Sequence, residues 1–158
     1  MADNETPERP RAVRLTIAYN GDQMELVSQH RVAMKVPPSD PVESAASAAD
    51  IAGETAGPTG FWVDLKDEQD QTLYRRVMHD PLRRDVEVFS PPGLPRTIER
   101  APVAEPRGVF SVVLPEIEAA QAVSLVGPPP RAMGAAELAA EGPEPSREIA
   151  RFDLKPRR

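Results

Sequence analysis

The sequence contains no cysteine among its 158 residues, and it has few aromatic residues: one Trp, two Tyr and four Phe. The lack of cysteine excludes disulfide bonds, thiolate nucleophiles and thiolate metal sites. Sugar-binding modules usually present exposed rings, whereas most of these few rings are needed for a hydrophobic core. A carbohydrate-binding module is therefore an alternative that would have to spare rings for the surface.

Basic charge and long apolar runs are also scarce. The net charge is -6, whereas binding to nucleic acid requires a concentrated basic face. No apolar run approaches the roughly 20 residues that span a bilayer. The N-terminal stretch MADNETPERPRAVR lacks the basic patch and apolar run of a secretory signal. We expect a cytoplasmic protein that binds neither nucleic acid nor membranes.

Motifs of catalysis are missing as well. The serines lack the GxSxG elbow, and no glycine-rich phosphate loop precedes a helical pattern. The two histidines, His30 and His79, have neither HxH nor HExxH spacing. In HDP, from His79 to Pro81, we expect Asp80 to bond nearby backbone in a turn. These observations predict a protein that is not an enzyme and holds no cofactor.

Strand patterns dominate what is present. Val13, Leu15 and Ile17 alternate with more polar residues, which predicts a half-buried strand. Asn20-Gly21-Asp22 predicts a hairpin turn into a strand that begins near Met24. Further strands are expected over 31–36, 61–65, 72–78, 86–88 with Val86 and Val88 facing inward, an edge strand near Ile98, and two strands within 108–127. About eight short strands without a helical period predict an all-β, antiparallel β-sandwich.

Nineteen prolines divide the chain, because proline is disfavoured inside helices and central strands. We predict a flexible leader over 1–11 and a β-sandwich domain over 12–127. The Ala-, Ser- and Gly-rich stretch near 39–60 is predicted to be a mobile insertion. Residues 128–158 are predicted to be a proline-rich linker followed by a docking strand.

Two segments carry a resemblance to a known family. GFWVDLKDEQDQTLYRRV and GVFSVVLPEIEAAQAVSLVG resemble the middle and closing hairpins of immunoglobulin-like β-sandwich modules of bacterial multi-domain proteins. The similarity covers residues 12–127, and the Cys pair of antibody-type domains is missing. Trp62 would take the buried central-strand position. The resemblance implies an accessory domain with a binding or structural role, because fold alone carries no chemistry.

The loop after Trp62 is acidic. Asp64, Asp67 and Asp70 recur at every third residue, and oxygen-rich loops of this kind ligate calcium. The loop departs from the EF-hand pattern because it has no glycine for the sharp turn. A calcium- or zinc-binding regulator, or a metal-dependent hydrolase that uses these aspartates with His79, is therefore an alternative function.

Two groups of residues are candidates for contact with a protein partner. Two arginine pairs, Arg75-Arg76 and Arg83-Arg84, flank the segment VMHDPL. Arginine is favoured at protein interfaces. The C-terminal REIARFDL alternates Ala150, Phe152 and Leu154 with charged residues, so this strand must dock on its own sheet or on another chain. Our first hypothesis is a non-enzymatic interaction or assembly module that binds a protein partner or itself. Its candidate contact residues are Arg75, Arg76, Arg83, Arg84, Arg151, Phe152 and Leu154.

Overall fold

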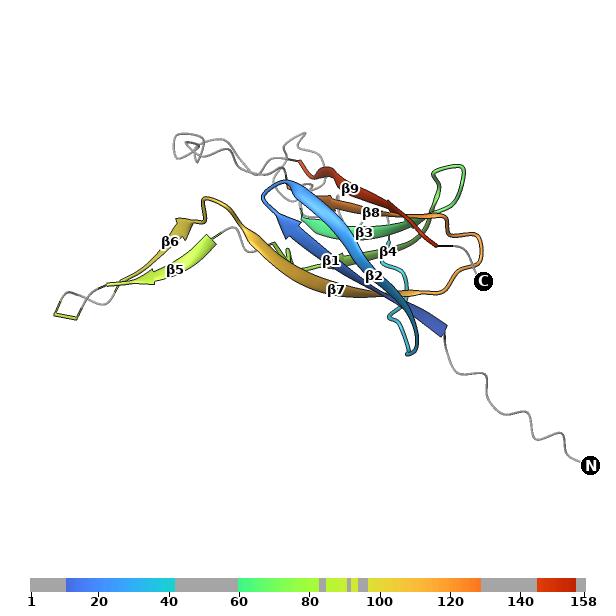
Figure 1. The fold of residues 1–158 in the computed structure, drawn as a ribbon, viewed down its shortest axis with the longest axis horizontal. Coiled ribbons are helices and arrows are strands. Elements are labelled where there is room, and N and C mark those ends of the chain that lie inside the picture. Colours follow the sequence, from blue (N-terminus) through green and yellow to red (C-terminus); the bar gives the residue numbers. More distant parts are fainter. Residues whose placement is uncertain are drawn as a thin grey trace, which may run out of the picture.

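The computed structural model describes residues 11–41, 60–82, 85–90, 92–93, 97–128 and 145–155. These residues form antiparallel strands and contain no helix, which confirms the expected all-β, antiparallel fold (Figure 1). Most of the predicted leader, insertion and linker lies outside the described residues. The strands are β1 (Arg11–Asn20), β2 (Gln23–Ala33), β3 (Phe61–Lys66), β4 (Thr72–Met78), β5 (Asp85–Phe89), β6 (Ile98–Pro102), β7 (Arg107–Pro115), β8 (Ala122–Gly127) and β9 (Arg147–Asp153).

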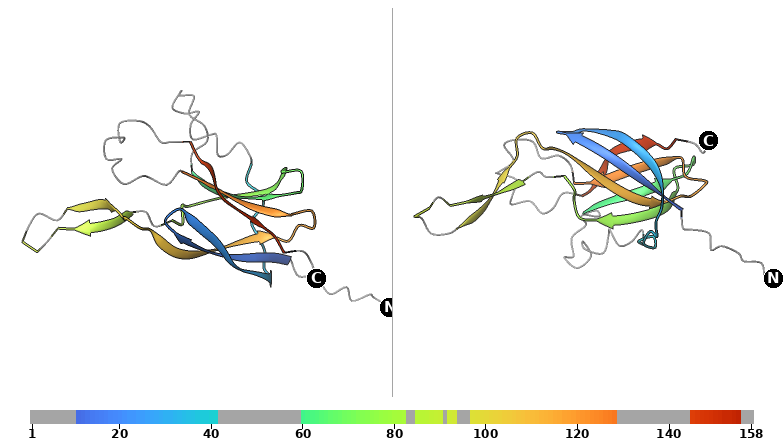
Figure 2. Two further views of the ribbon diagram at one scale, coloured as in Figure 1. Left: turned by 45° about the horizontal axis from the view of Figure 1, so that its top comes forward. Right: turned by 60° about the horizontal axis from the view of Figure 1, so that its bottom comes forward.

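Seven of these strands form two layers, as in a β-sandwich (Figures 1 and 2). One layer is a three-stranded sheet in the order β2-β1-β7, and the other is a four-stranded sheet in the order β4-β3-β8-β9. The remaining strands, β5 and β6, pair only with each other. We call this two-stranded unit the hairpin arm, because it projects away from the two layers.

The core lies between the two layers and follows the predicted alternation. In β1, Val13, Leu15 and Ile17 face the opposite sheet, so one apolar side of each strand is removed from water. The predicted hairpin is confirmed, since Asn20 pairs with Gln23 and Gly21 has a φ of 59° that suits glycine. The other buried members of the core are Phe61, Val63, Leu65, Tyr74, Val112, Leu114, Val123 and Leu125.

Strand β3 is buried on both of its faces. Phe61, Val63 and Leu65 belong to the core between the sheets, so Trp62 and Asp64 point to the opposite, outer face. Trp62 is buried there, and its indole Nε1 has no hydrogen-bond partner among the residues that the structure describes. Trp62 thus takes a buried position on a central strand, as the resemblance implies, but the alternation places Phe61 rather than Trp62 in the core between the sheets.

The expectation of a separate strand over 31–36 is wrong. Strand β2 runs without interruption to Ala33, with one irregularity where Thr16 pairs with Ser28 and Ile17 with Leu26. This bulge leaves Val27 as the extra, exposed residue. Beyond the bulge, β2 stays paired to β1 as far as Ala33. The residues from Arg31 to Ala33 therefore continue β2 and do not begin a new strand.

The segment after β2 crosses to the other layer and covers the free edge of β4. The backbone N–H of Asp40 donates to the carbonyl of Arg75 (2.8 Å), and its carboxylate accepts from the N–H of Val77 (2.8 Å). The hydroxyl of Tyr74 donates to the carbonyl of Pro37 (3.0 Å). This edge of the sheet is thereby protected from pairing with another chain.

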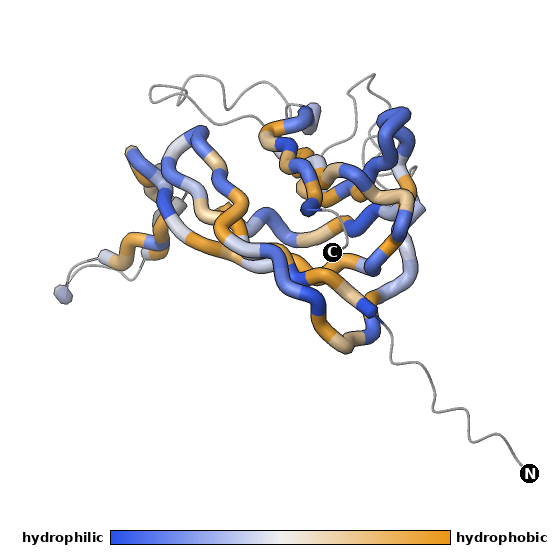
Figure 3. The backbone as a smooth tube through the Cα atoms, turned by 45° about the vertical axis from the view of Figure 1, so that its right-hand side comes forward, coloured by the Kyte–Doolittle hydropathy of each residue, from blue (hydrophilic) through white to orange (hydrophobic). Residues whose placement is uncertain are grey.

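The hairpin arm corrects another expectation. Val86 and Val88 do not face inward: they are 49% and 48% exposed. Phe89 and Ile98, which pair across the two strands, are 66% and 63% exposed. Figure 3 shows orange, apolar stretches on the arm, beyond the two sheets. The alternation predicted strands here, but these strands have no core to face.

Candidate functional site: a polar row and an exposed arm

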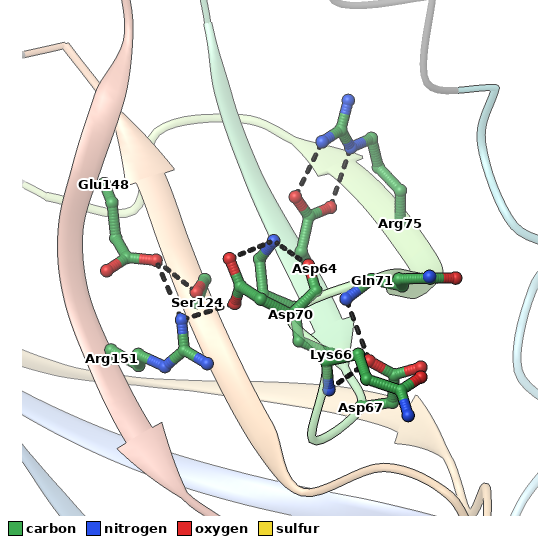
Figure 4. A network of polar contacts seen from close by, with 10 residues as sticks. Asp64, Lys66, Asp67, Asp70, Gln71, Arg75, Ser124, Glu148 and Arg151 are labelled. Carbon is green, nitrogen blue, oxygen red and sulfur yellow. Dashed lines mark hydrogen bonds and ion pairs between the residues drawn. The ribbon is translucent and has the colours of Figure 1, made fainter.

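A row of polar residues crosses the outer face of the four-stranded sheet. Arg75 in β4 pairs with Asp64 in β3, Asp64 pairs with Ser124 in β8, and Ser124 pairs with Arg151 in β9. Residues that are paired across antiparallel strands lie on the same face. The row therefore places four polar side chains next to one another on the face that is directed away from the core (Figure 4).

The first half of the row is a buried ion pair. The guanidinium of Arg75 donates from Nε to Oδ1 of Asp64 (2.7 Å) and from Nη2 to Oδ2 (2.6 Å). The two side chains are only 11% and 3% exposed. The same guanidinium lies 5.1 Å from the centre of the Trp62 ring, a cation–π contact. Two parallel hydrogen bonds and the Trp62 ring fix the side chain of Arg75 in place. Its charge is therefore neutralised by Asp64 within the domain.

The second half of the row holds the C-terminal strand and is more exposed. Arg151 donates from Nη1 to Oδ1 of Asp70 (2.6 Å), and its Nη1 lies 3.9 Å from Oε2 of Glu148. Ser124 donates to Glu148, and Lys66 Nζ lies 3.7 Å from Asp70. The hydrogen bond from Arg151 lowers the pKa of Asp70, and the same bond raises the pKa of Arg151. These contacts tie β9 to β8 and to the loop between β3 and β4.

The structure directs the proposed metal-binding residues to different partners. Asp64 pairs with Arg75, and Asp70 pairs with Arg151. Asp67 accepts hydrogen bonds from the backbone N–H of Gln69 and of Gln71, both at 2.9 Å, which closes its loop. His79 is exposed and lies beyond β4. The described part of the chain holds no group of three or more His, Asp or Glu side chains that could hold a metal ion.

The turn after β4 is as expected. The carboxylate of Asp80 accepts a hydrogen bond from the backbone N–H of Leu82 (2.9 Å), so the sequence His79-Asp80-Pro81 starts a turn, in which Asp80 bonds backbone.

The alternative function of carbohydrate binding would need exposed aromatic rings. The rings of Trp62, Tyr19 and Tyr74 are buried, whereas Phe89 in the hairpin arm is exposed.

Two of the arginine residues predicted to bind a partner, Arg75 and Arg76, lie on opposite faces of the four-stranded sheet. Arg75 points to the outer face, whereas Arg76 donates to the carbonyl of Val113 in β7 (3.0 Å), toward the other sheet. Neighbouring residues in a strand point to opposite faces. Arg83 and Arg84 lie outside the described residues, so their role stays a prediction.

Arg151 and Phe152 lie on β9, which pairs with β8 of its own chain, and Leu154 follows the end of this strand. Phe152 and Leu154 are partly buried and pack against the core. Arg151 lies on the outer face and pairs with Asp70. The predicted strand and its alternation are present, and whether it binds a partner stays a prediction.

The residues that sequence reasoning missed are the apolar side chains of the hairpin arm. Val88 and Phe89 are neighbours in β5, so they expose apolar surface on both faces of the arm. The sequence offers no local signal for this exposure. Prolines border the arm, but they also border β7, which joins a sheet: Pro106 precedes β7 and Pro115 ends it.

Comparison of the chain with protein-family models, curated proteins and solved structures found no match. Its functional assignment therefore depends on its own geometry. In the part of the chain that the structure describes, no helix has the length and apolar character that a membrane crossing requires.

Proposed function

We propose that the chain is a non-enzymatic protein-interaction or assembly module, built on an immunoglobulin-like β-sandwich. The hairpin arm is the observation that carries this proposal. Its four large apolar residues, Val86, Val88, Phe89 and Ile98, are about half exposed or more. An isolated two-stranded hairpin is at best marginally stable in water, so an arm of this kind gains stability when another molecule covers it.

The two faces of the arm indicate how it would be covered. Val86 and Val88 lie on one face, and the cross-strand pair of Phe89 and Ile98 lies on the other. A strand pair of a sandwich normally has one apolar and one solvated face. Apolar residues on both faces favour insertion of the arm between surfaces of a protein partner or of a second copy.

The immunoglobulin-like part of the proposal is supported by the two packed antiparallel sheets and by the aromatic residue Phe61 in the centre of the core. Trp62 does not support it, since its ring lies on the outer face. The buried Asp64–Arg75 pair has a structural role in this proposal, because both of its charges are satisfied within the domain.

The test alters the arm without altering the sandwich. Val86→Thr/Val88→Thr and Phe89→Thr/Ile98→Thr replace apolar surface on one face each. Val27→Thr/Val109→Thr is the matched control, because these valines are 57% and 65% exposed but lie on the three-stranded sheet. Binding is measured by mass in solution and by capture of partners from the source cells. We expect both arm variants to lose association at least about tenfold, the effect of removing central apolar contacts.

The control variant should retain wild-type association, and all variants should keep wild-type melting temperatures. The proposal fails if the arm variants and the control associate equally well. It also fails if the wild-type chain captures no partner and has the mass of a single chain at every concentration.

A further inference from the structure

Strands β8 and β9 are neighbours in space but distant in sequence. Nineteen residues, from Pro128 to Ser146, join them, whereas two residues join β1 to β2 and five join β3 to β4. An antiparallel pair needs a connection of only about two to five residues. Fully extended, the connection would span roughly 60 Å. The length of the connection therefore does not require β9 to pair within its own chain.

The contacts of β9 make a complete docking unit. Its backbone pairs with β8 from Ala122↔Asp153 to Gly127↔Arg147. At one end, Ser146 donates to the carbonyl of Gly60 (2.6 Å), and at the other, the N–H of Leu154 donates to the carbonyl of Gln121 (2.8 Å).

Side chains fix the register of this unit. Arg151 pairs with Asp70, and Lys155 donates its N–H to Oε1 of Gln29 (3.0 Å). All the groups that receive the strand, namely Gly60, Asp70, Gln121, Gln29 and β8, lie outside residues 145–155. The strand and its acceptor are thus two separate, complementary parts.

Burial differs sharply between the two parts. Five of the six residues of β8 are buried, whereas every residue of β9 is exposed or partly buried. In the four-stranded sheet, β9 is the one strand without a buried residue. Elements with little burial open first, and the uncovered edge of β8 would then be a template for another strand. The edge must be covered, but the strand that covers it can be replaced.

We propose that β9 is exchanged between two copies of this chain, so that each copy completes the four-stranded sheet of the other. The second copy is the occupant because it brings the same strand, with the same Arg151 for Asp70 and the same apolar residues for the core. Reciprocal exchange of identical elements gives a closed dimer with two-fold symmetry. This inference rests on the proposed assembly function and names its partner.

Exchange of β9 needs a second contact between the two copies, and the hairpin arm can supply it. The β9 strand of the same chain is held near β8 by its linker, at an effective concentration on the order of 1 mM. The β9 strand of a second copy must compete with it for the same edge of β8. At micromolar protein, an exchanged dimer therefore needs a second contact between the copies that contributes about a thousandfold in affinity. Burial of the exposed apolar residues of the arm in the dimer provides such a contact.

The absence of cysteine allows a direct test. Ala122 and Asp153 are paired across β8 and β9, at a spacing that suits a disulfide bond. Chains that carry only Ala122→Cys are mixed with chains that carry only Asp153→Cys, incubated at high concentration and oxidised. Glu25→Cys mixed with Asp153→Cys is the control for random collision, because Glu25 is exposed on the other sheet. The double variant Ala122→Cys/Asp153→Cys, oxidised when dilute, reports pairing within one chain.

We expect the cross-strand mixture to form covalent heterodimers at least about tenfold above the collision control, with a yield that rises with concentration. Exchange is overturned if the double variant closes within one chain while the mixture gives no more heterodimer than the control. Wild-type mass in solution gives a second measurement from about 1 µM to 1 mM. A single-chain mass throughout this range overturns exchange.

The two proposals fail in different ways. If the arm variants lose a partner while the cysteine mixture gives only collision products, the interaction function stands and the exchange of β9 is wrong. If heterodimers form equally well with the arm variants, exchange stands and the arm is not its second contact.

Discussion

The four-stranded sheet and the hairpin arm are built from similar stretches of sequence but differ in the burial of their apolar residues. Val63 and Leu65 alternate with Asp64 in β3, just as Val86 and Val88 alternate with Glu87 in β5. In β3 these apolar residues are almost fully buried, whereas in β5 they are about half exposed. Alternation thus predicts that a segment forms a strand, but it does not predict whether a second layer covers that strand.

The largest expected difference in the free energy of unfolding is between two phenylalanine substitutions, one in each region. Phe61 is buried in the core, and its ring meets that of Phe110 edge-on at 6.3 Å. Phe61→Ala should lower the free energy of unfolding by about 3 to 5 kcal/mol, because it leaves a cavity. Phe89→Ala, in the exposed arm, should change it by no more than about 0.5 kcal/mol. Urea unfolding of both variants measures the contrast, and equal losses would mean that the arm packs as part of the core.

The ion pair on the outer face gives the next largest effect. Asp64→Ala should cost about 3 kcal/mol or more, because it removes the carboxylate that neutralises the buried guanidinium of Arg75. The control is Glu105→Ala, next to the arm, since Glu105 and Arg107 are 3.7 Å apart and mostly exposed. Removing such a surface pair should cost no more than about 1 kcal/mol. A loss for Asp64→Ala as small as that of the control would show that Arg75 can reach water.

A close approach within the three-stranded sheet should give a smaller effect. A Cβ atom on Gly108 would lie 2.6 Å from the hydroxyl oxygen of Tyr19 and 2.8 Å from its Cζ. Because Tyr19 is buried, Gly108→Ala should destabilise the protein by about 1 to 3 kcal/mol through overpacking. Glu87→Ala in the arm is the control, with an expected change within about 0.5 kcal/mol. Chemical unfolding of both variants provides the measurement; an unchanged Gly108→Ala variant would place Tyr19 elsewhere.

The smallest effect concerns the exposed half of the polar row. The pKa of Asp70 is lowered from 3.8, chiefly by the hydrogen bond from Arg151. Its contribution to stability is therefore present above the ordinary pKa of the carboxyl and is lost as the pH falls through the lowered value. Asp70→Asn should lower the melting temperature slightly at neutral pH, and the difference from wild type should shrink at acid pH, as the pH falls below the ordinary value of 3.8.

Two checks accompany this last prediction. Added salt should weaken the effect of Asp70→Asn, since exposed pairs are screened. Glu118→Gln, in the exposed loop between β7 and β8, should leave the melting temperature unchanged at both pH values. A difference between Asp70→Asn and wild type that persists at acid pH would mean that the ion pair with Arg151 is not its cause.

Much of the fold could be predicted because strand formation is a local property. The alternation around Leu15 and the Asn20-Gly21 turn each depend on residues that are close in sequence, and both predictions are confirmed. The continuous strand β2 was missed because a bulge shifts the alternation at Val27, so one strand was interpreted as two. The polar row was not predicted as a unit, since its members come from four strands.

The sequence by itself determined where most of the strands form, where the first hairpin turns, and that neither thiol chemistry nor disulfides contribute. The tertiary structure alone decided that Asp64 neutralises Arg75, that Phe61 rather than Trp62 enters the core, and that Val86 and Val88 remain exposed. The physical reason is that backbone periodicity depends on neighbours in the chain. Burial and ion pairing depend on which distant strand lies opposite, and that is settled only when the two sheets pack together.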